Sequence, residues 1–378
     1  MKKHSQLLQL ILIVLPTWLA AETGTPGFER FLYNDKLPSN SVNRLFHDSK
    51  GYMWFGTRDG LSRFDGYDMK VFRSSPQTPG KLTSNEIQFI TEDNQSRIWV
   101  ATSEGVNIID NSSFTIHTLD NQFINKERIN SLLLDNEGMM WIGTTDYGVL
   151  RMNPQTEEFV RYSNEDDSPL KLPGNTVNHL YKDKSGNIWI SFWNHGLCMI
   201  SPDGKKIVST PQVGTKNNPF RILQDSRGEY WVLTWGDGIY KMQPDKSGKY
   251  RFEKLNPSPA STETIDDISY SITEDKNGLI WVVTYSGLRS IEKKGSEYLV
   301  SGSRHLFGNG DYQLFHSIIR DRNNNLWLGS VGEGVFQMDY NRLPVKNFNL
   351  QQIRNLNAEP YVTRFAEAGN KQIYLVIN

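Results

Sequence analysis

The most constraining feature of this sequence is an aspartate followed six residues later by a tryptophan, which occurs seven times. The pairs are Asp48/Trp54, Asp93/Trp99, Asp135/Trp141, Asp183/Trp189, Asp225/Trp231, Asp275/Trp281 and Asp321/Trp327. Successive tryptophans of the pairs lie 42 to 50 residues apart. Short apolar runs repeated with such a period are typical of a β-propeller that has one blade per repeat. We therefore expect an all-β fold, a seven-bladed β-propeller of four-stranded antiparallel blades.

Each repeat can be divided into a strand, a turn at the aspartate, and a second strand that carries the tryptophan. In the first repeat, Asp48 can accept a backbone hydrogen bond from two residues on, and Gly51 supplies the positive φ of the turn. Burial of one aromatic ring contributes roughly 4–6 kcal/mol before entropy is counted. A ring that recurs in every blade is explained by packing, so we expect each tryptophan to be a wedge between neighbouring blades.

The repeated Asp-x-x-Gly segment has a second interpretation as a calcium loop. A calcium loop requires alternating acidic ligands, and these are lacking here. We therefore favour the turn, and we predict no metal and no cofactor. The single cysteine, Cys198, lies in the apolar run 197–200. It is expected to be a small buried hydrophobic residue, and a reactive thiol is the alternative.

The N-terminus has the organisation of a secretory signal peptide. Lys2 and Lys3 precede an apolar stretch at 7–15, and small residues end at Ala21. This pattern predicts that residues 1–21 are removed after export. The alternative is an uncleaved membrane anchor, for which about nine apolar residues are few. The net charge of −1 provides no basic field for nucleic acid, which we exclude as a partner.

The two ends of the repeat array suggest how the ring closes. Residues 28–33 resemble a fourth strand, and we predict that they complete the last blade, which removes an open sheet edge. The propeller is expected to span 22–350. Residues 351–378 then begin an incomplete further repeat, in which Tyr374 occupies the tryptophan position and Ala368 the aspartate position. We therefore expect this chain to be the front part of a longer protein or the product of an interrupted gene.

The pattern Asp-x-x-Gly-x-φ-Trp-φ-Gly-Thr, followed by a variable turn and Gly-φ-x-Arg (φ is apolar), resembles the two-component regulator propeller repeat. The resemblance covers residues 28–376 and recurs seven times. It implies the periplasmic sensor region of a hybrid histidine kinase or a diguanylate cyclase. It also implies further propeller, β-sandwich and output domains in a full-length protein anchored in the inner membrane. An oligosaccharide ligand and a homodimer are further expectations.

A ligand site should lie where the repeat varies, in the turn after each tryptophan-bearing strand. Aromatic and charged residues gather there, and carboxylates suit sugar hydroxyls while rings suit sugar C–H faces. The candidate ligand-binding residues are Arg58, Asp59, Asp146, Tyr147, Trp193, His195, Trp235, Asp237, Tyr285 and Glu333. Three consecutive repeats have a large aromatic residue in this turn, namely Trp193, Trp235 and Tyr285, and we expect Asp266 to lie beside them. The alternative is that these aromatic residues cap the core or form an interface with a second propeller or protomer.

Three classes of function are compatible with this sequence. The leading hypothesis is an extracytoplasmic sensor or binding module without chemistry of its own. The second is a propeller enzyme, a lyase or hydrolase similar to streptogramin lyase, but the seven histidines are scattered and suggest no catalytic group. His195 has no second histidine or cysteine in its turn, which argues against a metal ligand. The third is a protein-interaction scaffold.

Overall fold

The computed structural model describes residues 27–75, 80–210, 212–246, 249–265, 268–303, 306–307 and 314–340, and the strands at 362–367 and 373–377. The propeller unit spans Gly27–Tyr340, and the last two strands belong to a separate unit. No helix among the described residues is long and apolar enough to cross a membrane.

Seven four-stranded antiparallel sheets form the blades, as predicted from the sequence. The innermost strands are β2 (Val42–His47), β6 (Ile87–Glu92), β10 (Ile129–Leu134), β14 (Val177–Lys182), β18 (Pro219–Gln224), β22 (Ser269–Glu274) and β26 (Phe315–Arg320). The second strands are β3 (Met53–Thr57), β7 (Ile98–Thr102), β11 (Met140–Thr144), β15 (Ile188–Phe192), β19 (Tyr230–Thr234), β23 (Ile280–Thr284) and β27 (Leu326–Ser330).

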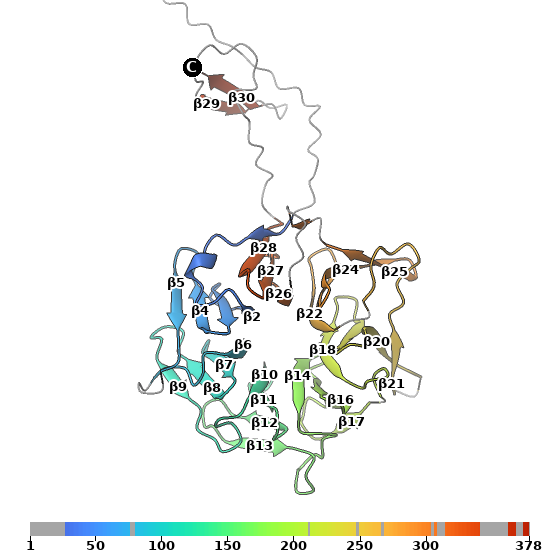
Figure 1. The fold of residues 1–378 in the computed structure, drawn as a ribbon. Helices are drawn as coiled ribbons and strands as arrows, with labels where there is room; N and C mark the ends of the chain where they lie inside the picture. Colours follow the sequence, from blue (N-terminus) through green and yellow to red (C-terminus); the bar gives the residue numbers. More distant parts are fainter. Residues whose placement is uncertain are drawn as a thin grey trace, which may run out of the picture. The chain divides into compact units, whose positions relative to one another are not determined.

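The outer half of each blade consists of a third and a fourth strand. The third strands are β4 (Gly60–Phe64), β8 (Gly105–Ile109), β12 (Val149–Met152), β16 (Gly196–Ile200), β20 (Ile239–Pro244), β24 (Gly287–Lys294) and β28 (Val335–Met338). The fourth strands are β5 (Met69–Phe72), β9 (Ile116–Thr118), β13 (Phe159–Tyr162), β17 (Ile207–Ser209), β21 (Tyr250–Lys254), β25 (Glu297–Gly302) and β1 (Glu29–Arg30). Figure 1 shows the innermost strands around the centre of the ring and the fourth strands at its periphery.

The ring closes as predicted, because the N-terminal strand β1 pairs with β28 and completes the last blade. The strand itself has only two residues, which is shorter than the predicted 28–33. The short 3-10 helix η1 (Asn34–Lys36) follows it. Asn34 continues the closure, since its side chain donates to the carbonyl of Val335 at 3.0 Å and accepts from the backbone N–H of Val335 at 2.8 Å. Two chain segments 301 residues apart are thereby joined.

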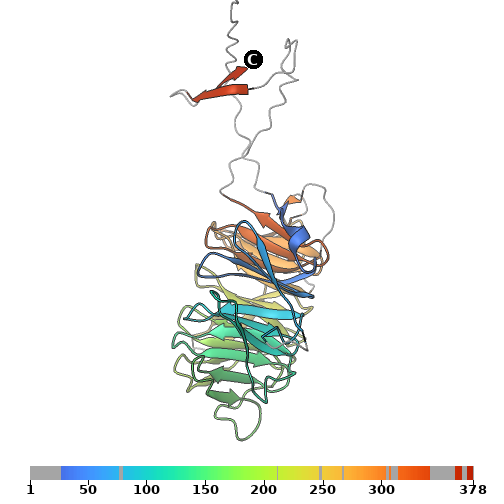
Figure 2. The same cartoon turned by 90° about the vertical axis from the view of Figure 1, so that its left-hand side faces the viewer.

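The hydrophobic core is divided into seven clusters, and each cluster lies between two consecutive blades. Trp54 packs with Ile87, Ile90 and Val100 of the next blade, and Trp327 packs with Val42 of the first blade. Five of the tryptophans are almost completely inaccessible to solvent. The predicted role of the tryptophans as wedges between blades is confirmed. Figure 2 shows the blades from the side of the ring.

The turn interpretation of the aspartates is also confirmed. Oδ1 of Asp48 accepts the backbone N–H groups of Lys50 at 3.0 Å and Tyr52 at 2.8 Å. Oδ2 accepts the indole N–H of Trp54 at 2.8 Å and the amide of Asn111 at 2.9 Å. Both oxygens are thus occupied by donors, which leaves the carboxylate no role as a calcium ligand. The bond from the indole to the carboxylate was not predicted.

Cys198 is fully buried within the core between the third and fourth blades, as expected for a small hydrophobic residue. The separate unit contains the hairpin of β29 (Val362–Glu367) and β30 (Ile373–Ile377). Its register places Ala366 opposite Tyr374, as Ile319 lies opposite Trp327 in the last blade. The hairpin also has a register shift near its start, as the first hairpin of each blade does. Residues 1–26, 341–361 and Ala368 lie outside the described residues, so the leader and the domain boundaries stay predictions.

Candidate functional site: an aromatic row on one face of the ring

The turns between second and third strands lie beside the connections that join one blade to the next. Three backbone hydrogen bonds show this. Trp193 N–H donates to Thr176 O at 3.0 Å, Trp235 N–H to Asn218 O at 3.0 Å, and Tyr285 N–H to Ile268 O at 2.7 Å. We call this side of the ring the connection face. The predicted site residues all belong to turns on this face.

Two of the predicted residues are in direct contact. The rings of Trp193 and Trp235 lie 6.0 Å apart at an interplanar angle of 65°. Trp235 in turn meets Phe220 at 5.1 Å and Tyr270 at 5.7 Å, and Tyr270 meets the ring of His316 at 5.0 Å. These five side chains form a continuous series across four blades, which we call the aromatic row. Trp193, at one end, is 38% exposed.

Three members of the aromatic row were missed by the sequence analysis. They occupy the second position of an innermost strand, where the register of the first hairpin shifts. Across the seven blades this position holds Asn43, Gln88, Asn130, Asn178, Phe220, Tyr270 and His316. An amide side chain at this position can tie neighbouring blades together, as Asn178 does by donating to Pro219 O at 2.9 Å. Alignment of the strands two residues before the shared aliphatic position would have revealed the change from amides to rings.

His195 and Tyr285 lie close to the aromatic row in the same set of turns. Both side chains are exposed, Tyr285 by 57%. The Nδ1 atom of His195 lies 2.8 Å from the carbonyl oxygen of Trp193, which holds the imidazole against its own turn. Asp266, which was expected nearby, lies outside the described residues.

The predicted carboxylates do not converge on the aromatic row. Oδ2 of Asp237 accepts hydrogen bonds from the N–H and hydroxyl of Thr215 and from the hydroxyl of Tyr240. Burial tends to raise the pKa of Asp237, but these hydrogen bonds and nearby Lys254 lower it below its ordinary value. The carboxylate therefore anchors a blade connection.

Asp59 and Glu333 have similar local partners. Asp59 pairs with Arg73 at 3.0 Å and accepts from the amide of Asn85 at 3.1 Å. Glu333 lies 3.8 Å from Arg30 of the closing strand. Each of these carboxylates thus joins its turn to an adjacent segment.

The remaining candidates lie in the first and third blades. The backbone of Arg58 donates to Ser41 O at 3.2 Å, and its side chain is exposed. The backbone N–H of Asp146 donates to the carboxylate of Glu127 at 2.8 Å. The ring of Tyr147 packs on Phe123 at 5.5 Å, and it is 38% exposed. These residues lie on the connection face, but the contact of Tyr147 with Phe123 includes no member of the aromatic row.

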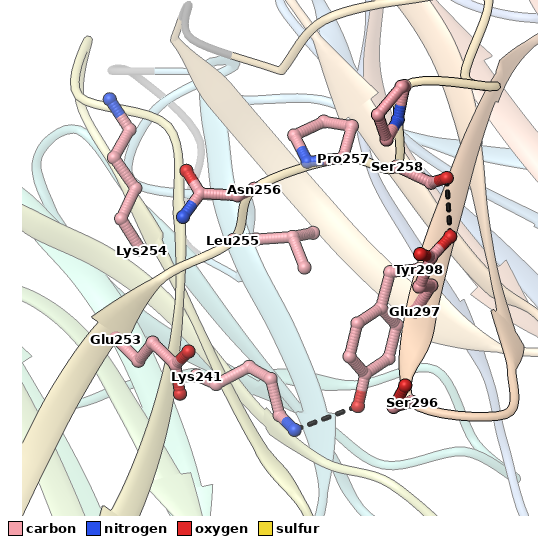
Figure 3. Close-up of a pocket in the computed structure, with 11 residues that line it drawn as sticks. Lys241, Glu253, Lys254, Leu255, Asn256, Pro257, Ser258, Ser296, Glu297 and Tyr298 are labelled. Atoms are coloured by element: carbon pink, nitrogen blue, oxygen red, sulfur yellow. Dashed lines mark hydrogen bonds between the residues drawn. The ribbon is translucent and has the colours of Figure 1, made fainter.

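A separate pocket of about 340 Å³ lies at the outer edge of the ring, between the fifth and sixth blades. Figure 3 shows that Lys241 donates to the hydroxyl of Tyr298 there, and that Ser258 donates to Glu297. Lys241 also contacts Glu229 at 3.0 Å, so its charge is already paired. None of the predicted site residues lines this pocket.

Comparisons with known proteins agree with this architecture. Four segments match the two component regulator propeller family, at residues 36–59, 81–104, 123–146 and 171–194. Histidine kinase P4 of Formosa agariphila is 39% identical over 59 residues, which is 16% of this chain and 4% of that protein. The alignment thus covers a small part of a much longer relative.

Solved structures share the fold. The extracellular domain of a putative hybrid two component system from B. thetaiotaomicron superposes with a TM-score of 0.66 at 19% identity, over 93% of this chain and 46% of that one. Virginiamycin B lyase from Staphylococcus aureus superposes with a TM-score of 0.59 at 12% identity, over 82% of this chain and 97% of the lyase. At these identities the likeness concerns the fold alone, and the chain spans less than half of the sensor domain. Because the family model matches four of the repeats and the whole ring has the expected architecture, the resemblance of these repeats to the two-component regulator propeller repeat is confirmed.

Proposed function

We propose that this propeller is the extracytoplasmic ligand-sensing part of a two-component signalling protein, and that its aromatic row binds the ligand. The observation that carries this proposal is the contact of Trp193 with Trp235 and, through it, with Phe220 and Tyr270. The five rings come from four blades and occupy two positions of the repeat, the turn after the second strand and the second residue of the innermost strand. The fold does not require a ring at either position, because other blades carry non-aromatic residues there. A partly exposed aromatic surface that departs from the repeat is a sign of binding.

The chemistry of the aromatic row favours a ligand with flat apolar faces and polar edges. Sugars have this character, because their axial C–H groups pack on aromatic rings. The carboxylates expected to bind sugar hydroxyls have other partners, so stacking is the main interaction that we propose. The ligand is then an oligosaccharide or another small molecule, held along the row rather than enclosed in a cavity.

The remainder of the signalling protein is also a proposal. The hairpin of β29 and β30 has the register of a blade hairpin, which supports a second propeller after this one. A β-sandwich, an output kinase or cyclase domain and a homodimer would complete the assembly implied by the family. The apolar segment at 7–15 supports export to the periplasm. The full-length protein would then be anchored in the inner membrane.

We propose that the propeller has no catalytic role. His316, in the aromatic row, has a pKa lowered to about 4, first by burial and then by the charges of Arg44 and Arg58. No carboxylate of a described residue forms a hydrogen bond or ion pair with this imidazole, and such a partner orients the general base in hydrolases. A ligand that is bound and released unchanged therefore fits this site better than a substrate.

The proposal can be tested by titrating the purified chain with a panel of oligosaccharides while its melting temperature is recorded. A ligand that binds only the folded state raises the melting temperature. We expect Trp193→Ala and Trp235→Ala to abolish the rise for the ligand that produces it. Tyr67→Ala is the control, because Tyr67 is an exposed ring (86%) in a turn between third and fourth strands, away from the aromatic row.

The outcomes distinguish the competing functions. Loss of the rise in the tryptophan variants but not in the Tyr67 variant supports the proposed site. If no oligosaccharide alters the melting temperature, the sugar proposal is wrong. Conversion of any panel member to a product, measured by chromatography, would favour an enzyme instead.

A further inference from the structure

A small cavity lies among the innermost strands at the centre of the ring. Its volume is about 230 Å³, and its lining comes from β2, β6, β14, β18, β22 and β26. These are strands that surround the centre in Figure 1. The polar side chains that line it are Arg44, His179, Tyr181, Arg221, Ser271 and Ser317. None of the described residues that line the cavity is acidic.

Among the described residues, the two arginines of this cavity form hydrogen bonds only with neutral groups. Arg44 donates to the carbonyl oxygens of Gln88 and Asn43, the latter at 2.8 Å. Arg221 is only 8% exposed, and it donates to the carbonyl oxygen of Tyr270 at 3.4 Å. A guanidinium group has five N–H donors, so these bonds use only part of its capacity. No carboxylate of a described residue forms an ion pair with either arginine.

Two further polar atoms in the cavity lack a partner. The Nδ1 atom of His179 and the hydroxyl of Ser317 are buried without a hydrogen bond among the described residues. Both residues line the cavity together with the arginines. A buried polar atom without a partner costs about 1–3 kcal/mol, so such atoms are uncommon unless a ligand completes the site.

Both charged side chains that line the cavity, Arg44 and Arg221, are positive. Burial and, to a smaller extent, the charge of Arg128 lower the pKa of Arg44 to about 10. Burial, followed by the charges of Arg221 and Arg44, lowers the pKa of His179 well below its ordinary value. Arg128 itself is exposed and lies 3.5 Å from Glu86, outside the cavity. The charge of half-buried Arg44 also lowers the pKa of buried Arg221, so the two guanidinium groups repel each other without a described counter-charge.

We propose that the central cavity binds a small oxyanion, held by Arg44 and Arg221 with His179 and Ser317 as additional hydrogen-bonding groups. Arginine pairs with carboxylate, sulfate or phosphate through two parallel hydrogen bonds, and burial strengthens this interaction. The volume lies below the range of about 300–1,000 Å³ of typical ligand pockets, which fits a small anion better than an oligosaccharide. This cavity shares no lining residue with the aromatic row, although Arg221 lies 5.2 Å from the ring of Phe220, and neither proposal depends on the other.

The experiment compares the melting temperature of the purified chain in sulfate, phosphate or acetate with that in chloride at equal ionic strength. Binding of one anion at concentrations well above its Kd should raise the melting temperature by about 2–5 °C. We expect the double variant Arg44→Met/Arg221→Met to lose this rise. In chloride it should melt at the same temperature as the wild type or higher, because two uncompensated charges, one buried and one half-buried, are gone.

Arg251→Met is the matched control, because the side chain of Arg251 is 76% exposed on the outermost strand β21. This variant should keep the full response to the anion. Sulfate also stabilises folded proteins by exclusion from their surface. An equal rise in the wild type and the double variant would therefore mean that the effect is general, and it would contradict the proposal.

Isothermal titration calorimetry of the wild type provides a test that does not depend on the folding of a variant. Saturable heat with one of the three anions, at about one site per chain, supports the proposal. The absence of binding heat with these three anions and with glucuronate contradicts it. A further comparison of glucuronate with glucose shows whether the oxyanion can be carried by a sugar. Binding of glucuronate alone supports such a source, and binding of sulfate or phosphate alone supports a free anion.

Discussion

The indole N–H of Trp189 donates a hydrogen bond of 2.9 Å to Oδ2 of Asp183. The same bond joins the aspartate and the tryptophan of all seven blades, at 2.8 to 3.1 Å. The aspartate therefore links the turn at one end of the first hairpin to the ring that packs against the next blade. Turn geometry and blade packing are two consequences of one side-chain pair.

Replacement of Asp183 by alanine should destabilise the propeller by about 2–4 kcal/mol. The carboxylate accepts bonds from the N–H groups of Ser185 and Asn187, the amide of Asn187, the indole of Trp189 and the hydroxyl of Tyr230. Several of these donors would be buried without an acceptor. The free energy of unfolding in urea measures the effect. Asp203→Ala, in an exposed turn of the same blade, is the control and should cost less than about 1 kcal/mol.

Stability at low pH should depend on Glu229, which lies between the fifth and sixth blades. Lys293 contacts its carboxylate at 2.8 Å and Lys241 at 3.0 Å. Burial would raise the pKa of Glu229, but the hydrogen bonds from these lysines outweigh burial and lower it to about 2. Because the folded pKa is below the ordinary value of 4.5, the stabilisation is present above about pH 4.5 and is lost as the pH falls towards 2.

Glu229→Gln should therefore reduce stability at pH 7 by on the order of 1–2 kcal/mol, once solvent screening is allowed for. The difference between wild type and variant should become small near pH 2. Thermal unfolding at pH 7, 5, 4 and 3 measures this trend. A difference that stays constant over this range would show that the carboxylate does not carry the effect.

The closing segment should be essential for a stable ring. Phe31 is 8% exposed and packs on Trp327 at 5.3 Å and on Phe64 at 5.0 Å. Phe31→Ala should cost about 3–5 kcal/mol, as is typical for a buried phenylalanine. The adjacent Leu32 is 90% exposed, so Leu32→Ala is a matched control with little expected effect. Equal melting temperatures for the two variants would show that closure does not limit stability.

The thiol of Cys198 should be unreactive in the folded protein. It is fully buried, and burial raises its pKa above the ordinary value. Since the thiolate is the reactive form, a thiol reagent such as DTNB should modify Cys198 only after unfolding. In denaturant the same assay should release one equivalent, because the chain has a single cysteine. Rapid modification without denaturant would show that the core of the fourth blade opens readily.

Some features of the candidate site were predictable and others were not. The regular spacing of the Asp/Trp pairs identified the turns that carry Trp193 and Trp235, because the residues of these turns differ from one repeat to the next. It did not indicate that Asp237 would be held by Thr215, since hydrogen bonding between a turn and a blade connection has no sequence period. The contact of Tyr270 with Trp235 was not predicted either, because a single aromatic residue in a strand is common in any hydrophobic core.

The sequence by itself determined the number of blades, the role of the tryptophans, the turn at each aspartate and the closure of the ring. These features are local or repeated, so pattern and spacing are sufficient to predict them. Only the tertiary structure decided that the aromatic row forms and that Arg44 and Arg221 share one cavity. These side chains come from strands and turns that lie tens to more than a hundred residues apart. Their proximity results from the curvature of the closed ring, which brings the innermost strands of all blades to a common centre.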